Sequence, residues 1–130
     1  MKLTLKQINQ DCLPYLITNY SKKRYPNKLR CIIYSLWYFS VLTKKEWLHL
    51  SRRNINTRVC SLRIVSGRRR TEYFSKKMVI HLLDYYKSEN EEKVLNFCLT
   101  NLEDLEIMCQ KLSKFLGKHL TSKSFKGRKR

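Results

Sequence analysis

A chain of 130 residues is long enough for one modest hydrophobic core and too short for two. Lys and Arg outnumber Asp and Glu by 28 to 10, and the formal net charge of +18 exceeds what solubility requires. We therefore expect a polyanionic partner. Nucleic acid comes first, because Lys and Arg that neutralise phosphates release counterions, and an anionic membrane surface comes second.

The first third of the chain predicts two helices. Apolar residues recur at near-helical spacing over 3–20, where Pro14 is expected to end or restart the helix. The stretch "SKKRYPNK" at 21–28 predicts a basic loop. The next helix is predicted over 28–40, because its apolar residues form a wide face that is typical of burial.

A short helix and a β-hairpin are expected next. Thr43 has the pattern of an N-cap, since Glu46 three residues later completes a capping box ahead of an apolar run. The stretch "NINTRVCSLRIV" at 54–65 has alternating apolar and polar residues, which predicts a β-strand. The turn "SGRRR" at 66–70 and the returning strand "TEYFS" at 71–75 complete an antiparallel hairpin with a positively charged tip.

The rest of the chain predicts helices over three ranges, 76–87, 91–99 and 102–116, with Gly117 as a C-cap. The expected fold class is therefore mostly α with a small antiparallel β-hairpin or sheet, an α+β single domain. We expect a basic globular domain over 1–120 and a basic C-terminal tail over 121–130.

The sequence offers no sign of a metal or a cofactor. Its five cysteines are odd in number and widely spaced, with no CxxC pair and no cluster of Cys and His at metal-ligand spacing. We interpret them as reduced core thiols of an intracellular protein, and we expect no metal and no cofactor. The longest apolar run, "CIIYSLWYF", is too short to span a bilayer, and a signal peptide's apolar region is missing. We expect a cytoplasmic or nucleoid-associated protein without a membrane partner.

Positive charge gathers in patches that are candidates for nucleic-acid contact. The hairpin tip and the end of the helix after Thr43 are the strongest candidates for phosphate contact. The candidate DNA-binding residues are Lys44, Lys45, Arg52, Arg53, Arg63, Arg68, Arg69, Arg70, Lys123, Lys126, Arg128 and Arg130. Any one of these patches could be an ordinary solvated surface, whereas all of them together favour nucleic-acid binding.

The order of motifs is informative about the family. The run "NKLRCIIYSLWYFSVLTKKEWLHLSRRNIN" is followed by a strand, a basic turn, "RTEYFS" and "KKMVIHLLDYYK". This order resembles the catalytic domain of the tyrosine recombinase (phage integrase) family. In that family an apolar helix ends in a Gly-Leu-Arg-x-x-Glu motif, and here Leu42 and Glu46 match it. The resemblance implies a recombinase-like catalytic core.

The resemblance also implies which functional groups are missing. Tyrosine recombinases attack a phosphodiester with a tyrosine while flanking arginines stabilise the phosphoryl charge. The family's first arginine falls on Thr43, its hairpin lysine on or near Arg68, and its later His and second Arg on Lys123 and Lys126. The sequence given ends at Arg130, ahead of the segment in which the nucleophile is expected. No catalytic residue is then intact, and we expect no strand cleavage from this chain alone.

These expectations combine into a DNA-binding protein with a degenerate recombinase-like fold and a preference for duplex DNA. Self-association, or association with a full-length recombinase, is a further expectation about partners. Three alternatives stay open: an active site-specific recombinase fragment completed in trans, an RNA-binding protein, and a winged-helix regulator. In the last, 43–51 lies near the recognition element and 58–74 forms the wing.

Overall fold

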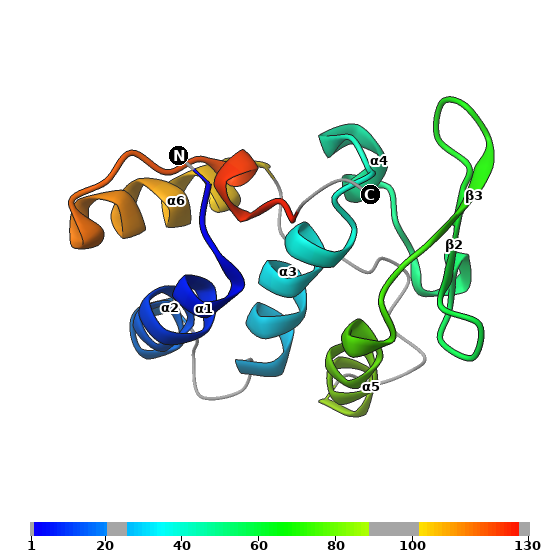
Figure 1. Ribbon diagram of the computed structural model, residues 1–130, viewed down its shortest axis with the longest axis horizontal. Helices are drawn as coiled ribbons and strands as arrows, with labels where there is room; N and C mark the ends of the chain where they lie inside the picture. Colours follow the sequence, from blue (N-terminus) through cyan, green and yellow to red (C-terminus); the bar gives the residue numbers. More distant parts are fainter. Residues whose placement is uncertain (1, 21–25, 89–101, 128–130) are drawn as a thin grey trace.

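The computed structural model describes residues 2–20, 26–88 and 102–127. Helices surround the central helix α3 (Pro26–Tyr38), and a three-stranded antiparallel sheet lies at one end of the molecule (Figure 1). The predicted fold class, mostly α with a small antiparallel sheet, is confirmed. The helix predicted over 91–99 lies outside the described residues, as do Arg128 and Arg130.

The N-terminal helix continues through Pro14 after a change of register. α1 (Leu5–Gln7) leads into the π-helical turn η1 (Ile8–Cys12), and α2 (Leu13–Tyr20) continues from it. The N–H of Leu13 donates to the carbonyl oxygen of Ile8, five residues back, so the helical register widens immediately before the proline. Proline has no N–H to donate, and a change of register at this point accommodates it without ending the helix.

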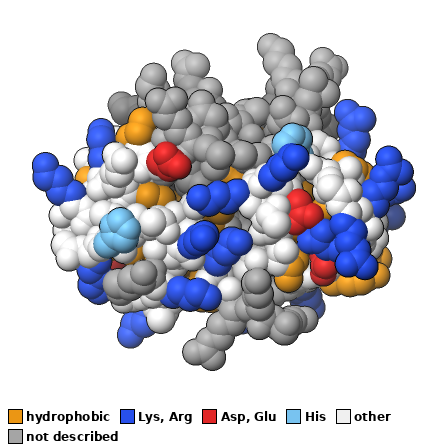
Figure 2. Space-filling view, turned by 90° about the horizontal axis from the view of Figure 1, so that it is seen from above, with side chains coloured by type: hydrophobic (Ala, Val, Ile, Leu, Met, Phe, Trp, Pro, Cys, Tyr) orange, Lys and Arg blue, Asp and Glu red, His pale blue; other side chains and the backbone are white. Residues whose placement is uncertain are grey.

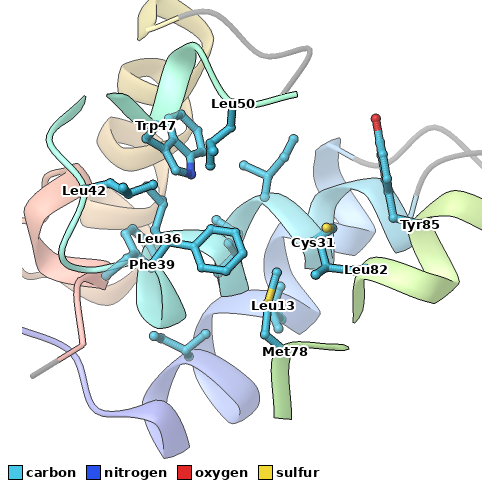
Figure 3. Packing of buried hydrophobic residues seen from close by; sticks show 14 of the residues in the cluster. Leu13, Cys31, Leu36, Phe39, Leu42, Trp47, Leu50, Met78, Leu82 and Tyr85 are labelled. Carbon is cyan, nitrogen blue, oxygen red and sulfur yellow. The ribbon is translucent and has the colours of Figure 1, made fainter. Parts of the chain in front are cut away.

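α3 is the helix around which the core is built. It packs against α2 on one side, α5 (Val79–Ser88) on another, and the C-terminal turn η4 (Ser122–Phe125). Figure 3 shows buried side chains from several of these elements meeting along α3. The buried residues among them include Leu13, Cys31, Leu36, Phe39, Met78, Leu82 and Tyr85. The apolar face predicted for this helix is therefore buried.

The sheet has three strands where the sequence predicted two. Its order is β1 (Ile55–Asn56), β2 (Ser61–Ile64) and β3 (Arg70–Tyr73), each pair antiparallel. The run 54–65, predicted as one strand, is folded back on itself. The Asn56 side chain accepts hydrogen bonds from the backbone N–H groups of Arg58 (3.0 Å) and Val59 (3.4 Å), which closes a turn within the run.

The helices predicted after the hairpin are largely confirmed. α5 begins from a single 3-10 turn, η3 (Lys76–Met78), that Ser75 caps through its side chain. Leu82 is buried on α5, whereas Leu83 is exposed. α6 spans Leu102–Leu116. Gly117 follows with a φ of +68°, and such a left-handed conformation favours glycine at the end of a helix.

The segment expected to begin a C-terminal tail belongs to the folded domain. Phe125 in η4 is buried against the core, and the N–H of Leu3 donates to the carbonyl oxygen of Ser124 (2.8 Å). The N–H of Gly127 donates to the carbonyl oxygen of Trp37 (3.2 Å). The globular domain therefore includes residues 121–127, because a buried aromatic ring outweighs the surrounding basic composition.

Candidate nucleic-acid interface

The turn between α3 and α4 (Lys44–Leu48) is organised by Thr43. Its hydroxyl accepts a hydrogen bond from the backbone N–H of Glu46 (3.2 Å), and the Glu46 carboxylate accepts one from the N–H of Thr43 (3.0 Å). This reciprocal pair is the predicted capping box, and it is confirmed. Thr43 therefore begins α4, and it occupies the position to which the sequence resemblance assigns an arginine.

Two cationic side chains converge on the two carbonyl groups that precede Thr43. Nη2 of Arg70, on β3, lies 3.5 Å from the carbonyl oxygen of Val41. Nζ of Lys126, after η4, donates to the carbonyl oxygen of Leu42 (3.2 Å). These carbonyls follow the C-terminus of α3, where the helix dipole is negative and favours cations. The fold thus brings β3 and the C-terminal segment to one turn.

Arg70 is held by two carboxylates. Its Nη1 and Nη2 donate to Glu46 Oε2 (2.6 Å) and Oε1 (3.1 Å), and its Nε donates to Glu72 (2.9 Å). Hydrogen bonds from Arg70 lower the pKa of Glu46 to about 2, with a further contribution from the Thr43 N–H. The same contacts raise the pKa of Arg70. A bidentate pair of this kind fixes α4 against β3.

The positions that the resemblance assigns to the two arginines lie together in the fold. Thr43 and Lys126 both line a small pocket with Lys44, Trp47 and Ser122. Its volume of about 20 Å³ is room for about one water molecule and not for a phosphate group. A phosphate would therefore contact this region from outside the pocket.

The other two motif positions, Lys123 and Arg68, do not line this pocket. Lys123 is exposed on η4, and Arg68 is exposed at the tip of the β2–β3 hairpin. The pocket beside the hairpin, which Glu46, Asn54 and Arg63 help to line, has a volume of about 10 Å³. Three of the four motif positions therefore lie near one another, because the N–H of Lys126 donates to the carbonyl oxygen of Lys123 (3.2 Å), whereas Arg68 lies on the hairpin.

Most of the candidate DNA-binding residues are exposed. Figure 2 shows Lys and Arg side chains gathered over the middle of the molecule and over the end that carries the hairpin. Arg52 differs, because its guanidinium lies 4.1 Å from the centre of the Tyr86 ring and stacks on that core residue. The exposed candidates are Lys44, Lys45, Arg53, Arg63, Arg68, Arg69 and Lys123.

Sequence reasoning missed two features of this surface. Lys76 and Lys77 are exposed immediately after β3, at the start of η3, and they extend the positive surface beyond the hairpin. The second is the pairing of Glu46 with Arg70, which ties up one of the predicted DNA-binding arginines. The sequence contained a signal for Lys76 and Lys77, because two adjacent lysines follow a predicted strand.

Within the described ranges, no group of three or more His, Cys, Asp and Glu is arranged to hold a metal ion. A search of the same residues for a membrane-crossing helix, one both long and apolar enough, finds none.

No protein-family model matches this sequence, and a search of curated proteins finds no match. Among solved structures, the crystal structure of XerA recombinase is similar, with a TM-score of 0.64 at 15% sequence identity. The match covers 96% of this chain and 47% of that one, so the chain spans about half the length of XerA recombinase. The fold is therefore similar to that of a tyrosine recombinase, as the motif order predicted.

Proposed function

We propose that this chain binds duplex DNA through its basic surface and does not cleave DNA strands by itself. The observation that carries this proposal is the exposure of cations on α4, on the hairpin and on η4 of a recombinase-like fold. These side chains come from separate elements, and a rigid domain that fixes their positions is suited to a rigid, regularly charged partner. Duplex DNA supplies one negative charge per ~1.7 Å of helix axis.

The proposed binding is mainly to phosphates. Each phosphate that Lys or Arg neutralises releases condensed counterions, so the affinity falls as salt rises, with a log–log slope of about 0.9 per contact. Arg70 contributes less than its sequence position suggests, because Glu46 and Glu72 already offset its charge. Lys44, Lys45, Arg68 and Arg69 are the principal contacts in this proposal.

Thr43 is the main reason that this chain should not cleave DNA strands. A threonine hydroxyl that caps a helix cannot stabilise a developing phosphoryl charge as a fixed guanidinium does. Removing one preorganised donor from such a site typically lowers the rate by about two to three orders of magnitude. Lys44 and Lys126 both line the pocket with Thr43, and Lys126 donates to a backbone carbonyl in this structure.

The proposal is tested by fluorescence anisotropy with a labelled 20-bp duplex over a range of salt concentrations. Lys44→Ala/Lys45→Ala should weaken binding and lower the salt slope by up to about 2, for two lost phosphate contacts. The matched control, Lys6→Ala/Lys114→Ala, removes the same charge from exposed positions on α1 and α6 and should leave the slope unchanged. Equal effects of the two variants would mean that net charge, and not this surface, governs binding.

Two further measurements address the alternatives. Competition with structured RNA and with single-stranded DNA of equal length should favour the duplex, and stronger binding to RNA would overturn the choice of DNA. Incubation with a nicked suicide substrate should trap no covalent adduct. A trapped adduct would show that the chain cleaves DNA despite Thr43.

A further inference from the structure

An open aromatic groove lies beside the basic surface. Its volume is about 640 Å³, within the range of about 300–1,000 Å³ that is usual for ligand sites. It runs between the C-terminal end of α3 and the end of β3. Its principal side chains are Trp37, Tyr38, Tyr73, Phe74, Ser40 and Ser75. Aromatic rings with a few hydroxyl groups are the surroundings that nucleobases favour, because every base has a face that can stack.

Tyr73 connects the groove to the basic surface. Its side chain is 70% exposed, although the next residue, Phe74, is buried in the core. Tyr73 pairs with Ser61 and Thr71 pairs with Arg63, so Tyr73 and Arg63 are diagonal neighbours on one face of the sheet. Long side chains reach one another at this separation. A base stacked on Tyr73 would therefore lie near a cation that can hold its phosphate.

The charges around the groove suit an anionic ligand. Glu72 is the acidic residue in the lining, and Arg70 Nε donates to its carboxylate (2.9 Å), which offsets its charge. Lys76 and Lys77 are exposed and follow Ser75, a lining residue, in the sequence. The groove thus has a largely aromatic lining, and exposed cations lie close to it along the chain.

The groove also adjoins the turn at Thr43. Gly127 forms part of its wall, where a Cβ would lie 2.6 Å from the carbonyl oxygen of Trp37. The preceding residue, Lys126, reaches the carbonyl oxygen of Leu42 and lines the pocket that contains Thr43. The groove and the proposed phosphate contacts therefore share one short segment of chain.

We propose that this groove accepts one or two unpaired bases, so that the chain binds duplex DNA with a single-stranded end or gap more tightly than blunt duplex. This inference rests on the proposed DNA binding and adds a substrate class to it. A stacked base is favoured over a peptide as the occupant, because Arg63 neighbours Tyr73 on the sheet and the exposed Tyr73 ring offers a flat face. Arg63, Lys76 and Lys77 would hold the phosphates that flank the base.

The test compares two duplexes that carry equal numbers of phosphates. One has a three-nucleotide overhang and the other has an overhang of three abasic residues. Each is tested as a 5′ overhang and as a 3′ overhang. The base-containing overhang should bind about tenfold more tightly, as expected for one stacked base worth ~1.4 kcal/mol. Tyr73→Ala should abolish this difference while leaving binding of blunt duplex unchanged, and Tyr73→Phe, which keeps the ring, should preserve it.

The outcomes separate this inference from the proposal on which it rests. If blunt duplex does not bind at all, the proposed function fails. If blunt duplex binds but the two overhangs bind equally, only the groove inference is overturned. A Tyr73→Ala variant that weakens blunt and overhanging DNA by the same factor would also overturn it. 2-Aminopurine placed in the overhang should lose fluorescence on binding to the parent chain and not to Tyr73→Ala.

Discussion

Arg70 on β3 holds Glu46 on α4 by two hydrogen bonds, Nη1 to Oε2 at 2.6 Å and Nη2 to Oε1 at 3.1 Å. Glu46 also closes the capping box of Thr43, so one carboxylate joins a helix start to a strand. The result is a rigid connection between two elements that both carry proposed phosphate contacts. An arginine that looks like part of a basic turn in the sequence therefore stabilises the fold.

The Glu46–Arg70 pair predicts a loss of stability in acid. The pKa of Glu46 is about 2 in the folded chain, below the ordinary value of about 4.3. A lowered folded pKa contributes stability that is present above about pH 4.3 and is lost as the pH falls toward 2. Because Arg70 is partly exposed, we expect a loss of about 1–2 kcal/mol, measured by urea unfolding between pH 5 and 2.5.

Glu46→Gln is the control for this pH dependence. Glutamine at this position preserves the capping box but removes the charge that pairs with Arg70. The variant should be less stable at pH 6 and should lose less stability on acidification than the parent chain. Identical pH profiles for the two would mean that other carboxylates govern the acid transition.

The arginines of the hairpin should divide into two functional groups. Arg68→Ala/Arg69→Ala removes two exposed cations and should weaken DNA binding with a change in unfolding free energy below about 0.5 kcal/mol. Arg70→Ala leaves Glu46 without its partner and should cost about 1–3 kcal/mol. Urea unfolding and anisotropy on the same preparations distinguish the two. A stable Arg70→Ala variant with strongly reduced DNA binding would reverse this assignment.

Replacing Thr43 with arginine should lower folding stability and strengthen the salt dependence of DNA binding. Thr43→Arg removes the helix cap and should cost about 1 kcal/mol of folding stability. The same change adds a cation beside Lys126, and it should raise the salt slope of DNA binding by about 0.9. Thr43→Ser keeps the cap without adding charge and should match the parent in both measurements. An unchanged slope in Thr43→Arg would place the DNA away from this turn.

The buried indole of Trp47 should make Ser35 important for stability. Trp47 Nε1 donates to Ser35 Oγ (2.7 Å), and Ser35 donates in turn to the carbonyl oxygen of Ile32 (2.6 Å). Ser35→Ala leaves a buried donor unsatisfied and should cost about 1–3 kcal/mol, measured by urea unfolding. In a Trp47→Phe background, which has no indole N–H, the same serine substitution should cost less than half as much. Additive costs would show that the hydrogen bond contributes nothing specific.

Much of the local structure could be predicted because it depends on contacts between near neighbours in sequence. The capping box of Thr43 and Glu46 spans three residues, and the apolar face of α3 and the glycine after α6 follow from helical spacing alone. The alternation of Leu62 and Ile64 predicted their burial in the hairpin. The net charge of +18 likewise suggested an anionic partner without any coordinates.

The turn after β1 and the burial of the C-terminal segment were harder to predict. Asn56 bends the run 54–65 by accepting two backbone hydrogen bonds, and this local preference outweighed the alternating pattern. At the C-terminus, the basic composition suggested a solvated tail. A single buried ring, Phe125, gains enough from contact with the core to hold the segment in place.

What the sequence determined by itself was the class of fold, the main helices of the described residues to within a few positions, and the sign of the charge. Only the tertiary structure decided which basic side chains are held by hydrogen bonds within the fold. Arg70 meets Glu46 across 24 residues, and Lys126 meets Leu42 across 84. Periodicity and spacing describe neighbours along the chain and contain no information about such distant pairs. Folding brings these groups together, and so it also decides that Arg70 and Lys126 meet the two carbonyl groups that precede Thr43.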